Sequence, residues 1–271
     1  MEVIIALWLR NLKIFWRNKP ALVVNLTFPF FFLFVFGNIF GDLLSMLSGI
    51  IAATMFDSAF RISSSTVDDM TGGFMKEVLV SPVSRTHIAV GQFASSATIA
   101  AVQGSLLLIG GLVVGYRVSS FLTIVYSLAA MLLIGIVYAG FGLFIATKSK
   151  NMQTFQAISM AVTMPMTFIS GAYIPISALP TALQWVAYFN PLTYAVNLFR
   201  AISLERTGHG FDYLLENHMA VEFWGLQIGT MESIVITAIF GLAFLALSSM
   251  SFSKLDFSKM NRKAGAFSMF E

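Results

Sequence analysis

The sequence predicts an all-α polytopic membrane protein with six transmembrane helices, and three observations support this. Of the 271 residues, 57% are hydrophobic and 11% are charged, whereas a soluble domain carries about 25% charged residues. Charge-free stretches recur along the chain and are long enough for spans of about 20 residues. The chain has no cysteine, so disulfide frameworks and cysteine-based metal or nucleophile sites are excluded.

The first two elements are an amphipathic helix and a phenylalanine-rich span. Within 2–19, apolar residues recur every three or four positions and basic residues occupy the other face, which is typical of a helix lying in the membrane interface. This helix either anchors the topology or acts as a lever in contact with a cytoplasmic partner. The first span is expected over 21–41, with Pro29 as a kink, and the second over 43–66.

The charge-free stretch 151–199 decides the number of spans. Prolines interrupt its second half, where a full-length helix is disfavoured. One span followed by an extracytoplasmic re-entrant hairpin places 13 of the 16 Lys and Arg residues on one side, whereas two spans place only 11 there. The positive-inside rule therefore favours six spans with both termini in the cytoplasm. The remaining spans are expected over 88–115, 119–147, 152–173 and 232–253, the hairpin over 175–199 and an external loop over 200–231.

The cytoplasmic segment 68–85 combines charges of both signs with apolar residues. A loop that only joined two spans would need a few polar residues, so this composition favours a short helix whose apolar face fills a groove in a partner protein. An ordinary juxtamembrane helix is the alternative. The residues expected to contact the partner are Gly72, Gly73, Phe74, Met75, Lys76, Glu77, Leu79, Pro82 and Arg85, together with Arg10 and Arg17 of the interface helix.

Two features inside the spans are candidates for a translocation path. Asp57 and Arg61 are four residues apart, so they share a helix face and can pair; they either line the path or form a structural pair near the inner surface. Phenylalanines facing lipid and methionines packing in the core are the ordinary alternative to a path lining. The residues expected to line the path are Phe28, Phe32, Phe36, Asp57, Met164 and Met166.

Several kinds of chemistry are not expected. The chain contains no G-x-x-x-x-G-K-[ST] phosphate loop and no His-Glu-x-x-His motif, so neither ATP binding of that type nor zinc-dependent hydrolysis is indicated. No metal site is expected, because the external His209 and His218 are nine residues apart and solvated histidines are more common. The residues from Phe211 to Trp224 could form one short surface helix. The net charge of +3 reflects the inner basic residues rather than nucleic-acid binding.

The segment 169–202, ISGAYIPISALPTALQWVAYFNPLTYAVNLFRAI, resembles the signature of the type-2 ABC exporter permeases, in their drug-resistance and nodulation-factor branch. The segment 77–85, EVLVSPVSR, resembles the cytoplasmic loop of that family, and the resemblance covers essentially the whole chain. Asp68 and Asp69 stand where the family often has an Arg-Glu pair. The matching positions in the first segment are Ser170-Gly171, Pro175, Leu179-Pro180, Trp185, Tyr188, Asn190-Pro191-Leu192-Thr193 and Arg200.

The resemblance implies a permease subunit in a bacterial or archaeal cytoplasmic membrane. Two copies, as a homodimer, would form the pore, and two copies of a separate ABC ATPase would bind ATP and Mg, so this chain would hold no cofactor. Residues 68–85 would be the coupling helix. The expected cargo is a hydrophobic or amphipathic compound such as a drug, a lipid or a lipid-linked molecule. The extracytoplasmic gate would comprise Gly171, Tyr173, Pro175, Pro180, Asn190 and Pro191.

Two alternatives to this function remain. One is an ABC exporter of a polysaccharide or glycolipid. The other, less favoured, is an ATP-independent secondary transporter or channel, for which an internal repeat would be expected and none is evident between the two halves.

Overall fold

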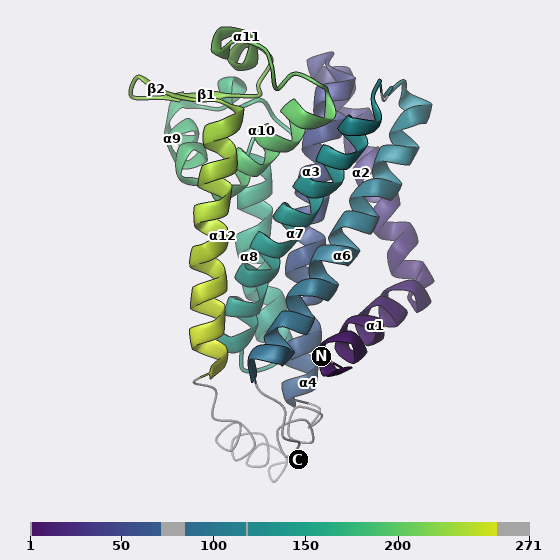
Figure 1. The fold of residues 1–271 in the computed structure, drawn as a ribbon. Helices are drawn as coiled ribbons and strands as arrows, with labels where there is room; N and C mark the ends of the chain where they lie inside the picture. Colours follow the sequence, from purple (N-terminus) through teal and green to yellow (C-terminus); the bar gives the residue numbers. More distant parts are fainter. Residues whose placement is uncertain (1, 72–84, 118, 254–271) are drawn as a thin grey trace.

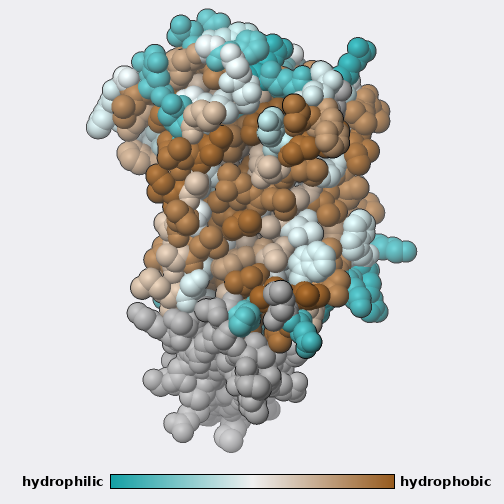
Figure 2. Space-filling view, in the orientation of Figure 1, coloured by the Kyte–Doolittle hydropathy of each residue, from teal (hydrophilic) through white to brown (hydrophobic). Residues whose placement is uncertain are grey.

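The computed structural model describes residues 2–71, 85–117 and 119–253 of the chain. Long helices run beside one another as a bundle, and the strands and most of the short helices gather at the end opposite the N-terminus (Figure 1). An apolar band surrounds the middle of the bundle on the face shown in Figure 2, and hydrophilic residues gather at the end that carries the short elements. The residues 72–84, which hold most of the contacts predicted for a cytoplasmic partner, lie outside the described part of the chain.

The described elements follow one another along the chain with few long connections. The first half comprises α1 (Glu2–Arg17), α2 (Lys19–Phe40), α3 (Leu43–Ile62), α4 (Ser64–Thr71), α6 (Arg85–Gly111) and the 3-10 turn η1 (Leu112–Val114). The second half comprises α7 (Phe121–Lys148), α8 (Met152–Ile169), η2 (Ile176–Ala178), α9 (Thr181–Phe189), α10 (Pro191–Ser203), α11 (Phe211–Glu216), β1 (Val221–Phe223), β2 (Leu226–Ile228) and α12 (Thr230–Ser253).

Five helical stretches in the described residues are long and apolar enough to cross a membrane. They are Lys19–Phe40, Leu43–Met70, His87–Gly111, Phe121–Lys148 and Thr230–Ser251. The helix α8 also runs along the bundle (Figure 1) but is not among them; Gln153 and Gln156 lower its hydropathy. The prediction of an all-α membrane protein is therefore confirmed, with five candidate spans.

The core of the bundle lies around α3. In the most apolar part of the candidate span Leu43–Met70, 83% of the residues are buried, against 17% for α2 and 22% for α12. Gly142 allows α7 to approach α3 closely, because a Cβ atom there would lie 2.7 Å from the backbone oxygen of Phe60. The sides of α2 and α12 that face away from α3 are left for lipid or for another protein chain.

Two predicted helices differ from those observed. The helix that begins at Leu43 breaks at Ser63, whose amide donates to the carbonyl of Phe60, and α4 begins at the next residue. The segment expected as one surface helix is helical only in α11. It continues as an antiparallel hairpin of β1 and β2, because Trp224 and Gly225 both have positive φ and form a tight turn.

Candidate functional site

A cavity of about 670 Å³ lies between α2, α3 and α8. This volume is within the range of about 300–1,000 Å³ that is common for small-molecule sites. Half of its lining residues are aromatic, aliphatic or methionine, and the other half are polar or charged. The residues that line it are Val24, Asn25, Phe28, Pro29, Phe32, Ala53, Thr54, Asp57, Arg61, Ser64, Gln103, Phe155, Gln156, Ser159, Met160, Thr163, Met164, Thr167, Phe168 and Tyr173.

An aromatic cluster forms one wall of this cavity. The Phe32 ring lies 4.8 Å from the Tyr173 ring and 6.1 Å from that of Phe168, measured between centroids. Phe28 also contacts Phe32 and lines the cavity. Phe36 lies outside the lining and packs against Tyr173 at 5.9 Å. The structure thus places Phe28 and Phe32 at the cavity and Phe36 behind Tyr173.

The two predicted methionines occupy different positions. Met164 lines the cavity, on an exposed face of α8. Met166 instead packs against the buried core, and its carbonyl accepts a hydrogen bond from the Nδ2 of Asn190 at 2.7 Å. This difference follows from helix geometry, because residues two apart on a helix face different sides.

The polar edge of the cavity is built around an ion pair. The Nε of Arg61 lies 3.3 Å from the carboxylate of Asp57, as their spacing predicts, and both residues line the cavity. The Nη2 of Arg61 also donates to the Oδ1 of Asn25 at 2.6 Å. Gln103 accepts a hydrogen bond from Ser58. Asn25 and Gln103 were not predicted as site residues, although amides in otherwise apolar spans were a signal that could have found them.

The amphipathic helix α1 is attached to α6 by side-chain hydrogen bonds. The indole Nε1 of Trp8 donates to the hydroxyl of Thr98 at 3.0 Å. The Nδ2 of Asn11 donates to Gln92 and to Ser95, each at 2.8 Å. Because Asn11 is buried, these bonds fix the position of α1 along α6.

A bidentate ion pair joins α1 to α4. The guanidinium of Arg10 donates to both carboxylate oxygens of Asp69, at 2.8 and 2.6 Å. The side chain of Asp69 is only 4% exposed, and the hydrogen bond with Asp69 raises the pKa of Arg10. The helix α1 therefore contacts both α4 and α6, the helices on either side of residues 72–84. Arg17, the other predicted contact residue of α1, is exposed in its last turn.

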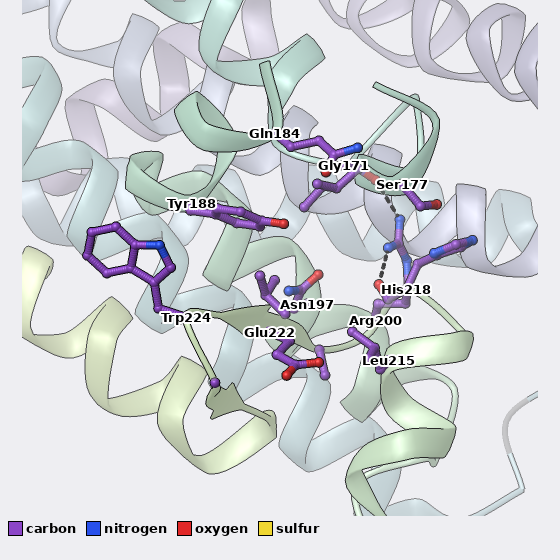
Figure 3. Close-up of a pocket in the computed structure, with 14 residues that line it drawn as sticks. Gly171, Ser177, Gln184, Tyr188, Asn197, Arg200, Leu215, His218, Glu222 and Trp224 are labelled. Atoms are coloured by element: carbon purple, nitrogen blue, oxygen red, sulfur yellow. Dashed lines mark hydrogen bonds between the residues drawn. The ribbon is translucent and has the colours of Figure 1, made fainter. Parts of the chain in front are cut away.

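A buried arginine organises the opposite end of the bundle. Arg200 is 1% exposed, and its guanidinium donates to the carbonyls of Ser45 at 3.0 Å, Gly171 at 2.9 Å and His218 at 2.5 Å. Two of these bonds are visible in Figure 3. Burial lowers the pKa of Arg200 to about 10, so the group stays charged at neutral pH. Arg200 thus holds together the start of α3, the chain after α8 and the loop after α11.

The predicted gate residues shape the chain between α8 and α10. Asn190 caps α10 by accepting from the amide of Leu192, and Pro191 occupies the first turn of that helix, where its missing N–H costs nothing. Pro175 and Pro180 precede η2 and α9. Tyr173 lines the cavity between the long helices, whereas Gly171 lines a second cavity at the end of the bundle.

A multi-pass helical bundle with a cavity between its long helices is typical of membrane transport proteins. Residues 2–204 match the family described as the ABC-2 type transporter, and the chain belongs to this family. The expected family is therefore confirmed.

Named relatives share about a quarter of their residues with this chain. Nodulation protein J of Rhizobium leguminosarum bv. viciae is 27% identical over 215 residues, which cover 74% of this chain and 82% of that protein. A protein of Cyanophora paradoxa named as the transport permease ycf38 is 23% identical over 239 residues, which cover 83% of this chain and 80% of the relative. Nodulation protein J of Rhizobium meliloti (strain 1021) is 25% identical over 215 residues.

The family assigns a general role to this chain. It is a multi-pass membrane permease and a non-catalytic component of an ABC exporter. Permeases of this family work with an ABC ATPase and typically bind no cofactor of their own.

Proposed function

We propose that this chain moves a hydrophobic or amphipathic compound out of the cytoplasm or the inner leaflet, through the cavity between α2, α3 and α8. The observation that carries the proposal is the composition of this cavity. Its walls include Phe28, Phe32 and Met164, while an ion pair stands at its edge. Apolar walls favour the apolar part of a ligand, and a few placed polar groups orient its other end.

The same cavity supports a homodimer as the working unit. Phe28, Phe31, Met160 and Met164 expose apolar surface on α2 and α8, beside the cavity. A second copy of the chain placed against these helices would cover that surface and close the path on its open side. Two copies of an ABC ATPase would then bind beneath the two permeases.

The proposed topology has six spans, with α8 as the fifth and both termini in the cytoplasm. The segment 175–199 forms the re-entrant hairpin. The outer gate comprises Gly171, Tyr173, Pro175, Pro180, Asn190 and Pro191. The basic residues near the α1 end support this orientation through the positive-inside rule.

The coupling step uses the segment 68–85 as the contact with the ATPase. The helix α1 supports this role, because Arg10 binds Asp69 on α4 and Asn11 binds α6. A push on that segment would therefore move α1, α4 and α6 together. The contact residues proposed for the ATPase are Gly72, Gly73, Phe74, Met75, Lys76, Glu77, Leu79, Pro82 and Arg85, with Arg10 and Arg17.

Transport in proteoliposomes tests the proposal. The chain is reconstituted with its ABC ATPase, and ATP-dependent movement of an amphipathic fluorescent dye is measured. Phe32→Ala and Asp57→Asn should reduce dye transport, whereas Ile239→Ala, on an exposed face of α12, should leave it unchanged. Dye movement by the permease alone, without ATP, would instead support a secondary transporter or channel.

The ATPase contact has its own test. The charge reversals Lys76→Glu and Glu77→Lys, made together, should weaken the complex of permease and ATPase in co-purification. A complex of unchanged stability would contradict the coupling role of this segment.

A further inference from the structure

A second cavity lies at the end of the bundle opposite α1. Its volume is about 410 Å³, and its lining residues come from the chain around η2, α9, α10, α11 and the β-hairpin. None of these residues also lines the cavity between α2, α3 and α8. Figure 3 shows polar side chains from several of these elements around one space. This cavity is therefore a separate place where a ligand could bind.

One buried side chain in this cavity lacks a hydrogen-bond partner. Asn197 lines the cavity and is 2% exposed, and its Nδ2 has no partner among the described residues. Leaving a buried donor unpaired is costly, and nearly all buried polar groups in proteins are paired. A ligand with a hydrogen-bond acceptor would satisfy this donor.

Two residues with unusual backbone conformations also line the cavity. His218 has a φ of 59° and Trp224 a φ of 50°. The turn at Trp224 and Gly225 has positive φ at both positions, and such hairpin turns favour Asn-Gly or Asp-Gly. A tryptophan there is not explained by turn preference, and strained residues often mark binding sites. The turn holds an indole that is 81% exposed at the edge of the cavity.

The lining offers both donors and acceptors beside aromatic faces. The Nε2 of Gln184 donates to the carbonyl of Leu179, which leaves its Oε1 as an acceptor. The carboxylate of Glu222 is a further acceptor, and the hydroxyl of Tyr188 can do both. Trp224 lies at one side of these polar side chains, and the Tyr188 hydroxyl points into the space between them (Figure 3).

An anionic ligand suits this lining less well than a neutral one. The charge of Arg200 is directed at three backbone carbonyls, so it is already solvated by the protein. Glu222, on β1, would repel an anion. Hydroxyl groups both donate and accept, so a neutral polyhydroxylated ring matches the mixed lining, and its apolar face can lie against Trp224.

We propose that this cavity binds a neutral saccharide unit, either as a free sugar or as the head group of a glycolipid. The inference goes beyond the proposed transport function, because binding at this site requires neither ATP nor the ATPase. It rests on the unpaired amide of Asn197, the strained Trp224 and the mixed polar lining of the cavity.

Binding to the full chain in lipid nanodiscs tests the proposal. Maltose and cellobiose probe free saccharides, and nanodiscs containing a monoglucosyl diacylglycerol probe a head group. Saturable binding is measured by tryptophan fluorescence and by saturation-transfer NMR. Binding of either kind supports the proposal, and comparing the two arms identifies the source of the saccharide.

Two variants and a control show whether binding occurs in this cavity. Trp224→Leu should weaken binding about fivefold through loss of the aromatic face. Asn197→Leu should weaken it about fivefold through loss of a hydrogen bond, without lowering the melting temperature, because it removes an unpaired buried donor. Phe189→Leu changes an exposed aromatic residue of α9 that does not line the cavity and should have no effect.

Two results would overturn the proposal. The first is an absence of saturable binding of maltose, cellobiose and the monoglucosyl head group to the wild-type chain, whether or not inorganic phosphate binds. The second is saccharide binding that neither Trp224→Leu nor Asn197→Leu weakens.

Discussion

The contacts of Arg200 lead to a quantitative prediction about the stability of the end of the bundle. In the variant Arg200→Leu, the carbonyls of Ser45, Gly171 and His218 lose their charged donor. A hydrogen bond to a charged group contributes about 1.5–3 kcal/mol. Removal of a buried charge returns part of this loss, because its desolvation is costly. We expect a net destabilisation of about 3 kcal/mol, at the lower end of the values for broken buried pairs.

The variant should be measured as the full chain in detergent, by the temperature at which it loses its native fold. A loss of about 3 kcal/mol corresponds to a fall in Tm of about 6–10 °C for a chain of this size. Arg200→Lys should fall between wild type and Arg200→Leu, because a lysine keeps the charge but lacks the guanidinium fork that reaches three acceptors.

An exposed arginine close in the sequence provides the control. Arg206 is exposed, and its guanidinium lies over the ring of Tyr213 at 5.5 Å. Arg206→Leu should change stability by no more than about 0.5 kcal/mol. If Arg200→Leu and Arg206→Leu melt at the same temperature, the three bonds of Arg200 do not hold this end together, and the reasoning fails.

Three further perturbations test other contacts of the structure. In a double-mutant cycle with Arg10→Ala and Asp69→Asn, the coupling free energy should be about 1–2 kcal/mol, between the values for exposed and buried pairs; additive effects would contradict the pair. Gly142→Ala should lower Tm, because its Cβ would meet the backbone of Phe60 at 2.7 Å; an unchanged Tm would show that α7 can shift. Burial and the charge of Arg200 lower the pKa of His218, while Asp42 opposes the shift. The unfolded state therefore binds the proton more tightly, and stability should fall as pH drops below about 6.5. In His218→Asn the new side chain tolerates the positive φ, and the melting temperature should depend less on pH. A pH dependence equal to that of the wild type would contradict the role of His218.

The long helices could be predicted because their signals are local. Charge-free runs of apolar residues mark spans whatever the helices later contact, and the pairing of Asp57 with Arg61 follows from a spacing of four. The Met166 position could not be assigned in this way. Its side chain packs against the core, and only the packing of α8 against its neighbours decides which methionine faces the cavity.

Contacts between segments that are distant in the chain could not be predicted from the sequence. Arg10 and Asp69 lie 59 positions apart, and Arg200 and Ser45 lie 155 apart. Neither spacing carries a periodic signal. The change from α3 to α4 at Ser63 also has no signal in the sequence, since no glycine or proline stands there. The turn at Trp224 was missed because its first residue is not one that such turns prefer.

The physical chemistry of the bilayer explains why irregular backbone gathers at one end of this bundle. Inside lipid, each backbone N–H and C=O must be paired within the protein, which the long helices achieve alone. The chain between α8 and α12 leaves this pattern, so its carbonyls need other donors. Arg200 donates to two of them, those of Gly171 and His218, and also to the carbonyl of Ser45 in α3. A single charged donor that serves three segments ties their positions together. Arg200 therefore links the loop at His218, which lines the second cavity, to α3, which lines the first.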